Sequence, residues 1–230
     1  MKMRILAIES SSKPASVAVC EDGELVSVLF QRSGLTHSRT LLQMAQDVLK
    51  NLEMTVRDVD LIAVAHGPGS FTGIRIGISA AMGLSWGADI PVAGVSTLEA
   101  MAYQAGVEGY TICPVLDARR EQIYNAKFVW RGGRLERLCP DRAISLEALA
   151  LEEIPSSAPL FLIGDGAGLC ADFLAGKSID FTLAPAISRN QTAFGVALAA
   201  QNGDITPGNG VAPNYIRMSQ AERLLKGERD

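Results

Sequence analysis

The chain has 230 residues, of which 48% are hydrophobic and 20% are charged, a composition typical of a globular protein with enough core for one large or two small domains. Its formal net charge of −4 argues against a protein that grips nucleic acid by itself, because neutralising phosphates requires a basic face. The four cysteines are scattered without a Cys-x-x-Cys pair, which favours free buried thiols over disulfides.

The longest uncharged stretch near the centre of the chain, 76–88, is shorter than the ~20 residues that a membrane-spanning helix requires. The apolar run 5–8 is too short for the hydrophobic region of a secretory signal, and Glu9 ends it. We therefore expect a cytoplasmic protein, and we interpret 76–88 as part of a buried helix.

Apolar periodicity predicts strands and helices throughout the first half of the chain. Two stretches with capping-box spacing, Thr55-x-x-Asp58 and Ser96-x-x-Glu99, mark the starts of a short turn and of a helix. The predicted elements are strands over 4–9, 15–20 and 25–30, a helix over 37–52, a strand over 61–65, a helix over 74–88, a strand over 91–95 and a helix that ends near 105.

A glycine-rich stretch, residues 67–77, separates the strand 61–65 from the following helix and reads Gly-Pro-Gly-Ser-Phe-Thr-Gly-Ile-Arg-Ile-Gly. A strand, a glycine-rich loop and a helix in this order bring backbone N–H groups close to a bound phosphate. The same order also makes a tight turn that lets the helix press against a neighbour, because glycine permits approaches that a Cβ atom forbids. No lysine follows the loop as in a Walker A motif, and both interpretations stay open.

The second half of the chain repeats the pattern of the first. Strands over 112–117, 122–130 and 134–138 again form a meander, and 160–168 resembles 61–69 with an offset of 99 positions. A helix over 190–201 follows, and Glu9 and Asp117 end the first strand of each half. Two β-β-β-α-β-α units predict an α/β fold with two domains, 1–105 and 106–230, and a cleft between them.

Six segments also carry a resemblance to a known family: Ile5-Leu-Ala-Ile-Glu-Ser-Ser11, His37-Ser38, 67–77, Gly94-Val-Ser-Thr-Leu98, Asp117-Ala-Arg-Arg-x-x-Ile-Tyr124 and Pro213-Asn-Tyr-Ile-Arg217. They resemble the TsaB family of tRNA threonylcarbamoyladenosine biosynthesis proteins, also called YeaZ. The resemblance covers nearly the whole chain, and the block 67–77 is highly specific. It implies the actin-like ATPase (ASKHA) fold with two RNase H-like halves, in agreement with the duplication.

The resemblance implies a role in tRNA modification. Proteins of this family pair with a paralogue, TsaD, that carries the threonylcarbamoyl transfer, and a small ATPase, TsaE, joins them. Together they install N6-threonylcarbamoyl (t6A) on adenosine 37 of tRNAs that read codons starting with A. The TsaB-type member is a noncatalytic scaffold that often forms a homodimer through the surface used by the paralogue. The chain itself would then need no cofactor, while the complex uses ATP and Mg²⁺ and makes most contacts with tRNA.

An apolar surface shared by the two longest predicted helices is the expected partner interface. Gly73, Gly77 and Ala81 recur every four positions, which allows a close helix crossing. Arg75 lies in apolar surroundings, so it needs either an ion pair within the fold or a contact across the interface. His37 is either a capping residue or part of that interface. The candidate interface residues are His37, Leu41, Met44, Val48, Ile74, Arg75, Ile78 and Met82.

The sequence departs from an actin-like ATPase at the first phosphate-binding turn. Such ATPases open with Asp-x-Gly-Ser/Thr, whereas this chain has Glu9-Ser-Ser-Ser12 and lacks the glycine. Both differences weaken Mg²⁺ and phosphate binding, because Mg²⁺ demands tight geometry. We therefore predict no catalytic residue and only residual nucleotide binding. The residues for it are Glu9, Ser11, Gly67, Gly69 and Asp117.

Neither His37 nor His66 has a second histidine or a Cys-x-x-Cys pair at ligand spacing, so we predict no metal site. A second hypothesis is an independent actin-fold ATPase or small-molecule kinase in the interdomain cleft, with hydrolysis lost when Glu9 or Asp117 is changed to Ala. A zinc peptidase has the least support. The charged tail 216–230 fits either a short amphipathic helix or a frayed end.

Overall fold

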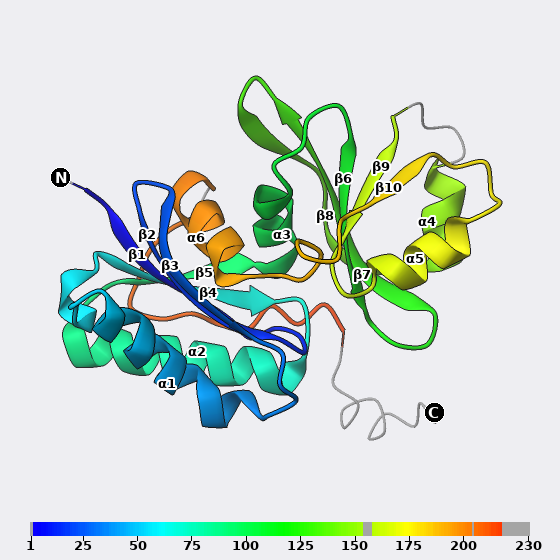
Figure 1. Ribbon diagram of the computed structural model, residues 1–230. Helices are drawn as coiled ribbons and strands as arrows, with labels where there is room; N and C mark the ends of the chain where they lie inside the picture. The colour runs from blue at the N-terminus through cyan, green and yellow to red at the C-terminus, as the bar shows by residue number, and fades with distance from the viewer. Residues whose placement is uncertain (1, 154–157, 204, 218–230) are drawn as a thin grey trace.

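The structure, a computed structural model, describes residues 2–153, 158–203 and 205–217, and it contains two five-stranded sheets (Figure 1). Their strand orders, β3-β2-β1-β4-β5 and β10-β9-β6-β7-β8, use the same connectivity twice. In each sheet the first three strands are antiparallel, and the last two run parallel to the first. This confirms the predicted duplication and α/β fold. The strands are β1 (Arg4–Glu9), β2 (Ala15–Glu21), β3 (Glu24–Gln31), β4 (Leu61–Gly67), β5 (Val92–Ser96), β6 (Thr111–Asp117), β7 (Gln122–Arg131), β8 (Arg134–Ser145), β9 (Leu160–Ile163) and β10 (Phe181–Leu183).

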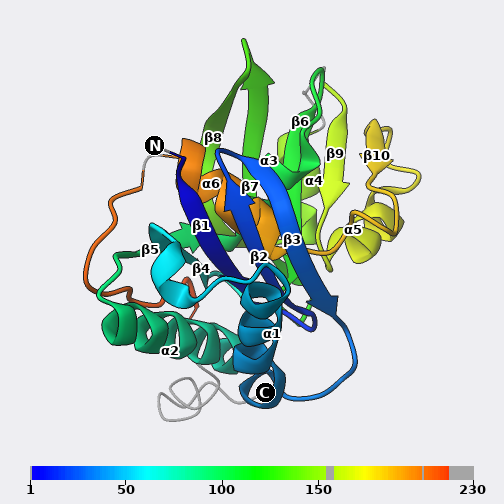
Figure 2. The same ribbon diagram turned by 60° about the vertical axis from the view of Figure 1, so that its left-hand side comes forward.

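Helices cover both faces of the first sheet (Figure 2). The helices α1 (His37–Asn51) and α2 (Phe71–Ala88) lie on one face, and α3 (Thr97–Ala105) and α6 (Ala193–Asn202) lie on the other. Because side chains alternate along a strand, Leu6 belongs to the α1–α2 core while its neighbour Ala7 belongs to the α3–α6 core. Burial on both faces explains why β1 is a continuous apolar run.

The helix α3 lies between the two sheets. Its side chains Leu98 and Met101 pack with Ile112 and Phe128 of the second sheet, while Tyr103 packs with the core of the first sheet. The helix α6 follows the second sheet in the sequence but packs on the first. Elements from both sides of position 105 therefore contribute to one core, and the boundary between 1–105 and 106–230 stays a prediction.

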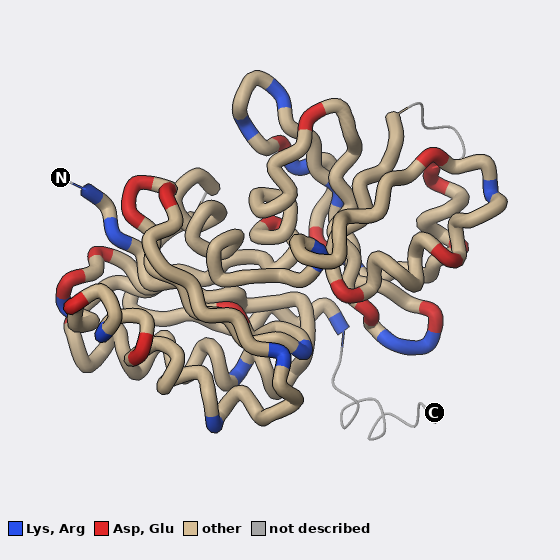
Figure 3. Tube along the Cα trace, in the orientation of Figure 1, with Lys and Arg blue, Asp and Glu red and all other residues tan. Residues whose placement is uncertain are grey.

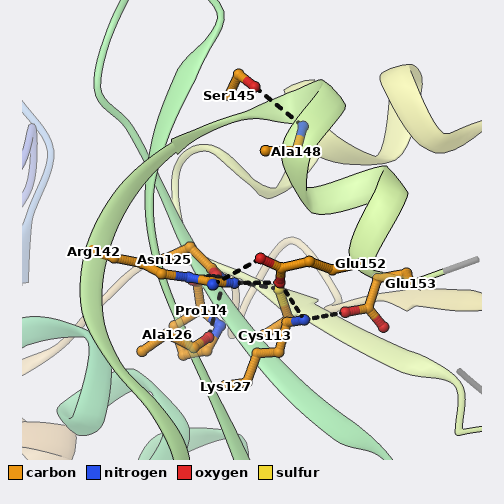
Figure 4. Close-up of polar contacts among 10 residues, drawn as sticks. All are labelled: Cys113, Pro114, Asn125, Ala126, Lys127, Arg142, Ser145, Ala148, Glu152 and Glu153. Atoms are coloured by element: carbon orange, nitrogen blue, oxygen red, sulfur yellow. Dashed lines mark hydrogen bonds and ion pairs between the residues drawn. The ribbon is translucent and has the colours of Figure 1, made fainter.

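The other face of the second sheet carries α4 (Leu146–Glu153) and α5 (Ala167–Leu174). A network of polar side chains fastens α4 to β7 and β8 (Figure 4). The buried Asn125 amide accepts hydrogen bonds from Arg142, which in turn binds Glu152 through Nη1 at 2.9 Å and Nη2 at 2.6 Å. Lys127 pairs with Glu152 at 2.9 Å and with the neighbouring Glu153.

Several boundaries differ from the predicted ones for local reasons. The helix α2 begins at Phe71 rather than Ile74, because the Ser70 hydroxyl accepts the Gly73 N–H and caps the helix there. The strand β8 extends to Ser145 through Pro140, which an edge strand tolerates. The sequence did not predict α4, α5 or β10, which are short. The 3-10 turn η1 (Val56–Asp58) opens with the predicted capping box.

The helix α3 keeps only half of its predicted capping box. The Ser96 hydroxyl accepts the Glu99 N–H at 3.2 Å, but the Glu99 carboxylate binds Arg137 at 2.7 Å instead of the cap. The four cysteines are free thiols as predicted: Cys20, Cys113 and Cys170 are buried, and Cys139 is half-buried. Within the described part of the chain, no helix combines the length and the apolar character needed to cross a membrane.

Candidate functional site

A polar cleft of about 610 Å³ opens between the carboxyl ends of β1 and β6. Ser11, Gly69 and Asp117, three of the five residues proposed for nucleotide binding, line it. Asp165, which sequence reasoning missed, joins the two sides: Ser12 Oγ donates to Asp165 Oδ2, and the Asp117 N–H donates to Asp165 Oδ1 at 3.2 Å. The offset of 99 that relates the two glycine segments pairs Asp165 with His66, which does not line the cleft, so the repeat did not mark Asp165 as a site residue.

Glu9 lies behind the cleft rather than in it. Its side chain is fully buried and does not line the cleft, and its Oε1 atom accepts the Ser11 N–H at 2.6 Å. Burial raises the pKa of the Glu9 carboxyl to about 7, the hydrogen bond from the Ser11 N–H opposes this shift, and the nearby Asp165 charge adds to it. Within the described residues, neither Glu9 Oε2 nor Ser11 Oγ has a hydrogen-bond partner.

The glycine loop makes close backbone contacts within the chain. A Cβ atom at Gly69 would lie 2.3 Å from the Ser11 carbonyl oxygen, which also accepts the Ser70 N–H at 2.6 Å. Gly67 does not line the cleft; a Cβ there would lie 2.6 Å from the Asn214 carbonyl oxygen. The loop thus matches the second interpretation of its sequence, a tight turn that lets neighbouring backbone approach.

The glycines at the start of α2 pack most closely against the residue that follows β1, and Gly73 also lies against His37 at the start of α1. Cβ atoms at Gly73 and Gly77 would lie 2.1 Å and 2.4 Å from the backbone and side-chain oxygens of Ser10, respectively. Ala81 is buried in the core beneath the sheet. The tightest contacts of Gly73 and Gly77 are thus with the end of β1 rather than with a second helix.

Five of the eight candidate interface residues are buried within the chain itself. The side chains that lie inside the chain's own core are Leu41, Met44, Val48, Ile74 and Ile78. Their helical periodicity marks the sides of α1 and α2 that face the first sheet. Met82 and His37 are half-buried, and Arg75 is exposed.

The outward sides of α1 and α2 form a different surface, which we call the α1–α2 groove. It has a volume of about 360 Å³, and Leu42, Ile76 and Ser79 line it together with three of the predicted interface residues, His37, Leu41 and Arg75. Leu42 is 49% exposed. Farther along α2, Trp86 is 67% exposed. The sequence analysis missed Leu42 and Ile76 because they lie outside the main apolar stripe.

Arg75 makes a hydrogen bond and cation–π contacts within the fold, and its expected contact across an interface stays a prediction. Its Nε donates to the Tyr215 hydroxyl at 2.6 Å, and its guanidinium lies 5.5 Å from the Tyr215 ring centre. Phe71 stacks on Tyr215 with ring centres 4.2 Å apart. Beyond Tyr215, Arg217 donates to the Ala118 carbonyl oxygen at 2.6 Å, so the segment 213–217 touches both halves. The rest of the tail, 218–230, lies outside the described residues.

The two histidines have separate environments. His37 Nε2 donates to the Ser12 carbonyl oxygen at 2.7 Å, since a carbonyl can only accept. Burial lowers the pKa of His66, although a backbone hydrogen bond at Ala212 partly opposes the shift. Among the described residues, no group of three or more His, Cys, Asp or Glu side chains is arranged to hold a metal ion.

Comparisons with known proteins agree with this architecture. The family model described as TsaD, tRNA N6-adenosine threonylcarbamoyltransferase, matches residues 31–191. The chain is 29% identical to the tRNA threonylcarbamoyladenosine biosynthesis protein TsaB of Bacillus subtilis, over 96% of both chains. It is 35% identical to the protein of the same name from Haemophilus influenzae, over 62% of this chain and 67% of that protein.

Solved structures show the same fold. A YeaZ structure from Pseudomonas aeruginosa superposes with a TM-score of 0.76 at 25% identity, over 93% of this chain and 99% of that one. Component A of the (R)-2-hydroxyglutaryl-CoA dehydratase of Acidaminococcus fermentans, at 14% identity, gives a TM-score of 0.52 over 85% of this chain and 96% of its own. The fold is the predicted actin-like ATPase (ASKHA) fold with RNase H-like halves. The chain therefore belongs to the TsaB (YeaZ) family of tRNA threonylcarbamoyladenosine biosynthesis proteins.

Proposed function

We propose that this chain is a noncatalytic scaffold subunit that activates a TsaD-type transferase in t6A synthesis, with a TsaE-type ATPase as the third component. The α1–α2 groove is the observation that carries this proposal. It places the exposed side chain of Leu42 beside half-buried Ile76, with Trp86 farther along α2. Interface cores are richer in apolar and aromatic residues than the remaining protein surface. The groove also suits self-association into a homodimer.

The geometry of the cleft supports the noncatalytic part of the proposal. Glu9, at the position of the phosphate-binding aspartate in an actin-like ATPase, is buried behind Ser11. The Ser70 N–H at the glycine loop is bonded to the Ser11 carbonyl oxygen. We further propose that this chain requires no cofactor, that the complex uses ATP and Mg²⁺, that most contacts with tRNA come from the other subunits, and that the protein works in the cytoplasm.

The test is a reconstitution from purified components. A TsaD-type subunit, a TsaE-type ATPase and a threonylcarbamoyl-AMP synthase are combined with Mg-ATP, threonine, bicarbonate and tRNA, with and without this chain. Mass spectrometry of the digested tRNA measures t6A, and phosphate release by the chain alone measures ATP hydrolysis.

The scaffold proposal predicts that t6A requires this chain and that the chain alone neither forms t6A nor hydrolyses ATP. Equal t6A with and without the chain would reject it. ATP hydrolysis by the chain alone, lost in the variant Asp117→Ala, would instead support the independent ATPase or kinase, because Asp117 lines the cleft.

A further inference from the structure

A second pocket, of about 470 Å³, lies at the N-terminal ends of α1 and α2. We call it the basic pocket. Lys13, Arg32 and His37 line it, and among its described lining residues none carries a carboxylate. It adjoins the interdomain cleft, with which it shares Lys13 and Ser70, and it adjoins the α1–α2 groove through His37 and Ile76.

In the part of the chain that the structure describes, Lys13 and Arg32 lack the polar partners that many of the other cationic side chains have. Both are exposed, and within the described residues neither has a hydrogen-bond or ion-pair partner. By contrast, Arg4, Arg137 and Arg142 each pair with at least one carboxylate. The loop that leads from β3 to α1, residues 32–36, has one basic residue, Arg32, and no acidic one, and Figure 3 colours no acidic position on it. A chain of net charge −4 thus keeps two uncompensated positive charges at one pocket.

The start of α1 adds to the positive potential of the basic pocket. The Thr36 side chain makes no capping hydrogen bond, and the first turn of this 15-residue helix contains no acidic residue. The first N–H groups of a helix carry partial positive charge, which favours a bound anion. Here the partial charge of the helix end adds to the positive potential at the pocket. The full charges of Lys13 and Arg32 make the larger contribution to the attraction of an anion.

The wall of the basic pocket is partly apolar. Leu35 is 45% exposed, and Ile76 is half-buried, so both offer carbon surface to a ligand. The hydrogen bond from His37 to the Ser12 carbonyl oxygen fixes the orientation of the imidazole ring in the wall of the pocket. A ligand that combines a phosphate with a sugar or base fits this pocket, because its phosphate can lie against the cations and its sugar or base against the apolar wall.

We propose that the basic pocket binds the phosphate of a nucleotide unit, with Lys13 and Arg32 as its cationic contacts. The same chemistry is available from two sources, the backbone of an RNA and the phosphates of a free nucleotide. This binding is a property of the chain itself and does not depend on the scaffold role. The pocket is also separate from the position of Glu9 behind the interdomain cleft.

The test uses the purified full chain. Fluorescence anisotropy with labelled tRNA measures affinity over a series of salt concentrations. Inorganic pyrophosphate and ATP are titrated into the chain by calorimetry, and both are also added as competitors of the labelled tRNA. The variants Lys13→Gln and Arg32→Gln remove one charge each at the pocket. Their matched controls, Lys50→Gln and Arg57→Gln, remove one exposed charge each at other sites. All four positions are on the surface, and circular dichroism checks that each variant folds.

We expect Lys13→Gln and Arg32→Gln to weaken binding, while the control variants bind like the unmodified chain. If RNA is the source, each pocket variant also lowers the magnitude of the slope of log K against log salt by about 0.7 to 0.9, and pyrophosphate competes poorly. If a free nucleotide is the source, pyrophosphate and ATP bind with the same sensitivity to the pocket variants. Equal losses in pocket and control variants, or no binding of either ligand, would overturn the proposal.

Discussion

The backbone carbonyl oxygen of Ser10 lies 2.1 Å from the position that a Cβ atom at Gly73 would occupy. The Ser10 hydroxyl also donates to the Gly73 carbonyl oxygen at 2.9 Å. The end of β1 and the first turn of α2 are therefore in direct backbone contact. This contact sets the height of α2 above the sheet and with it the positions of the cleft and of the α1–α2 groove.

The first prediction concerns this contact. Gly73→Ala forces the backbone of Ser10 or of α2 to move, so we expect the free energy of unfolding to fall by about 2 kcal/mol or more. Gly83, in the same helix, has no atom within 4 Å of its Cβ position. Gly83→Ala should stabilise the chain by up to about 1 kcal/mol through helix propensity. Urea unfolding measures both, and equal effects would contradict the role of the contact.

The architecture was predictable because its signals are local. Apolar runs, capping boxes and the offset between the glycine segments mark both sheets, and these patterns repeat in each half. The outward surfaces were not predictable in the same way. Periodicity identifies an apolar stripe but does not distinguish core from interface, and Met44 and Ile78 proved to be core while Leu42 is exposed.

The parts of the site that were missed depend on contacts between distant segments. Asp165 lies 153 positions from its partner Ser12, and Tyr215 lies 140 positions from Arg75. The local sequence around Asp165 and around Tyr215 gives no indication of these two pairings. Glu9 shows the reverse case, since its place at the end of a strand was clear from sequence while its burial away from the cleft required the packed structure.

The second prediction separates surface from core on α1. Leu42→Asp places a charge in the α1–α2 groove, and we expect it to abolish homodimer formation and binding of a TsaD-type partner while the fold stays intact. Met44→Asp places the charge in the core and should unfold the chain, since an unpaired buried charge is prohibitively costly. Sedimentation velocity measures association, and thermal melting measures folding.

A matched control for Leu42→Asp exists on the other half of the molecule. Leu151 of α4 is 62% exposed, so Leu151→Asp introduces the same change on another helix surface. It should leave association unchanged. Loss of association in the Leu151 variant, or full association in a folded Leu42 variant, would show that the α1–α2 groove is the wrong surface.

The third prediction concerns the polar network of Figure 4. Hydrogen bonds from Arg142, opposed by partial burial and aided by Lys127, lower the pKa of the Glu152 carboxyl to about 2. Its stabilising effect is therefore present above its ordinary pKa of 4.5 and is lost as the pH falls toward 2. Because Glu152 is partly exposed, we expect Glu152→Gln to cost only about 1 kcal/mol at pH 7.

The control for Glu152 is Glu147 of the same helix, which is 63% exposed and 3.8 Å from Lys177. Glu147→Gln should change the unfolding free energy by less than about 0.5 kcal/mol at pH 7. Denaturant unfolding at pH 7 and at pH 3 measures both variants. A Glu152→Gln deficit that is as large at pH 3 as at pH 7 would argue against ionic pairing with Arg142.

The fourth prediction has the opposite sign and concerns Glu9. Because burial raises the pKa of its carboxyl from the ordinary 4.5 to about 7, the folded chain holds a proton that the unfolded chain releases above pH 4.5. The contribution of Glu9 to stability is thus greatest below pH 4.5 and declines until the pH passes about 7. A glutamine at this position does not titrate, and its oxygen still accepts the Ser11 N–H.

We therefore expect Glu9→Gln to gain stability relative to the unmodified chain as the pH rises from 4.5 to 7, by a total of about 3 kcal/mol. Urea unfolding of both proteins at intervals across this range measures the difference, in which all other titrating groups cancel. A difference that is constant with pH would mean that Glu9 ionises in the folded chain as easily as in the unfolded one. That result would require a cation or a water-filled path beside Glu9. The negative charge of the carboxylate would then contribute to the electrostatic potential of the cleft although the side chain is buried.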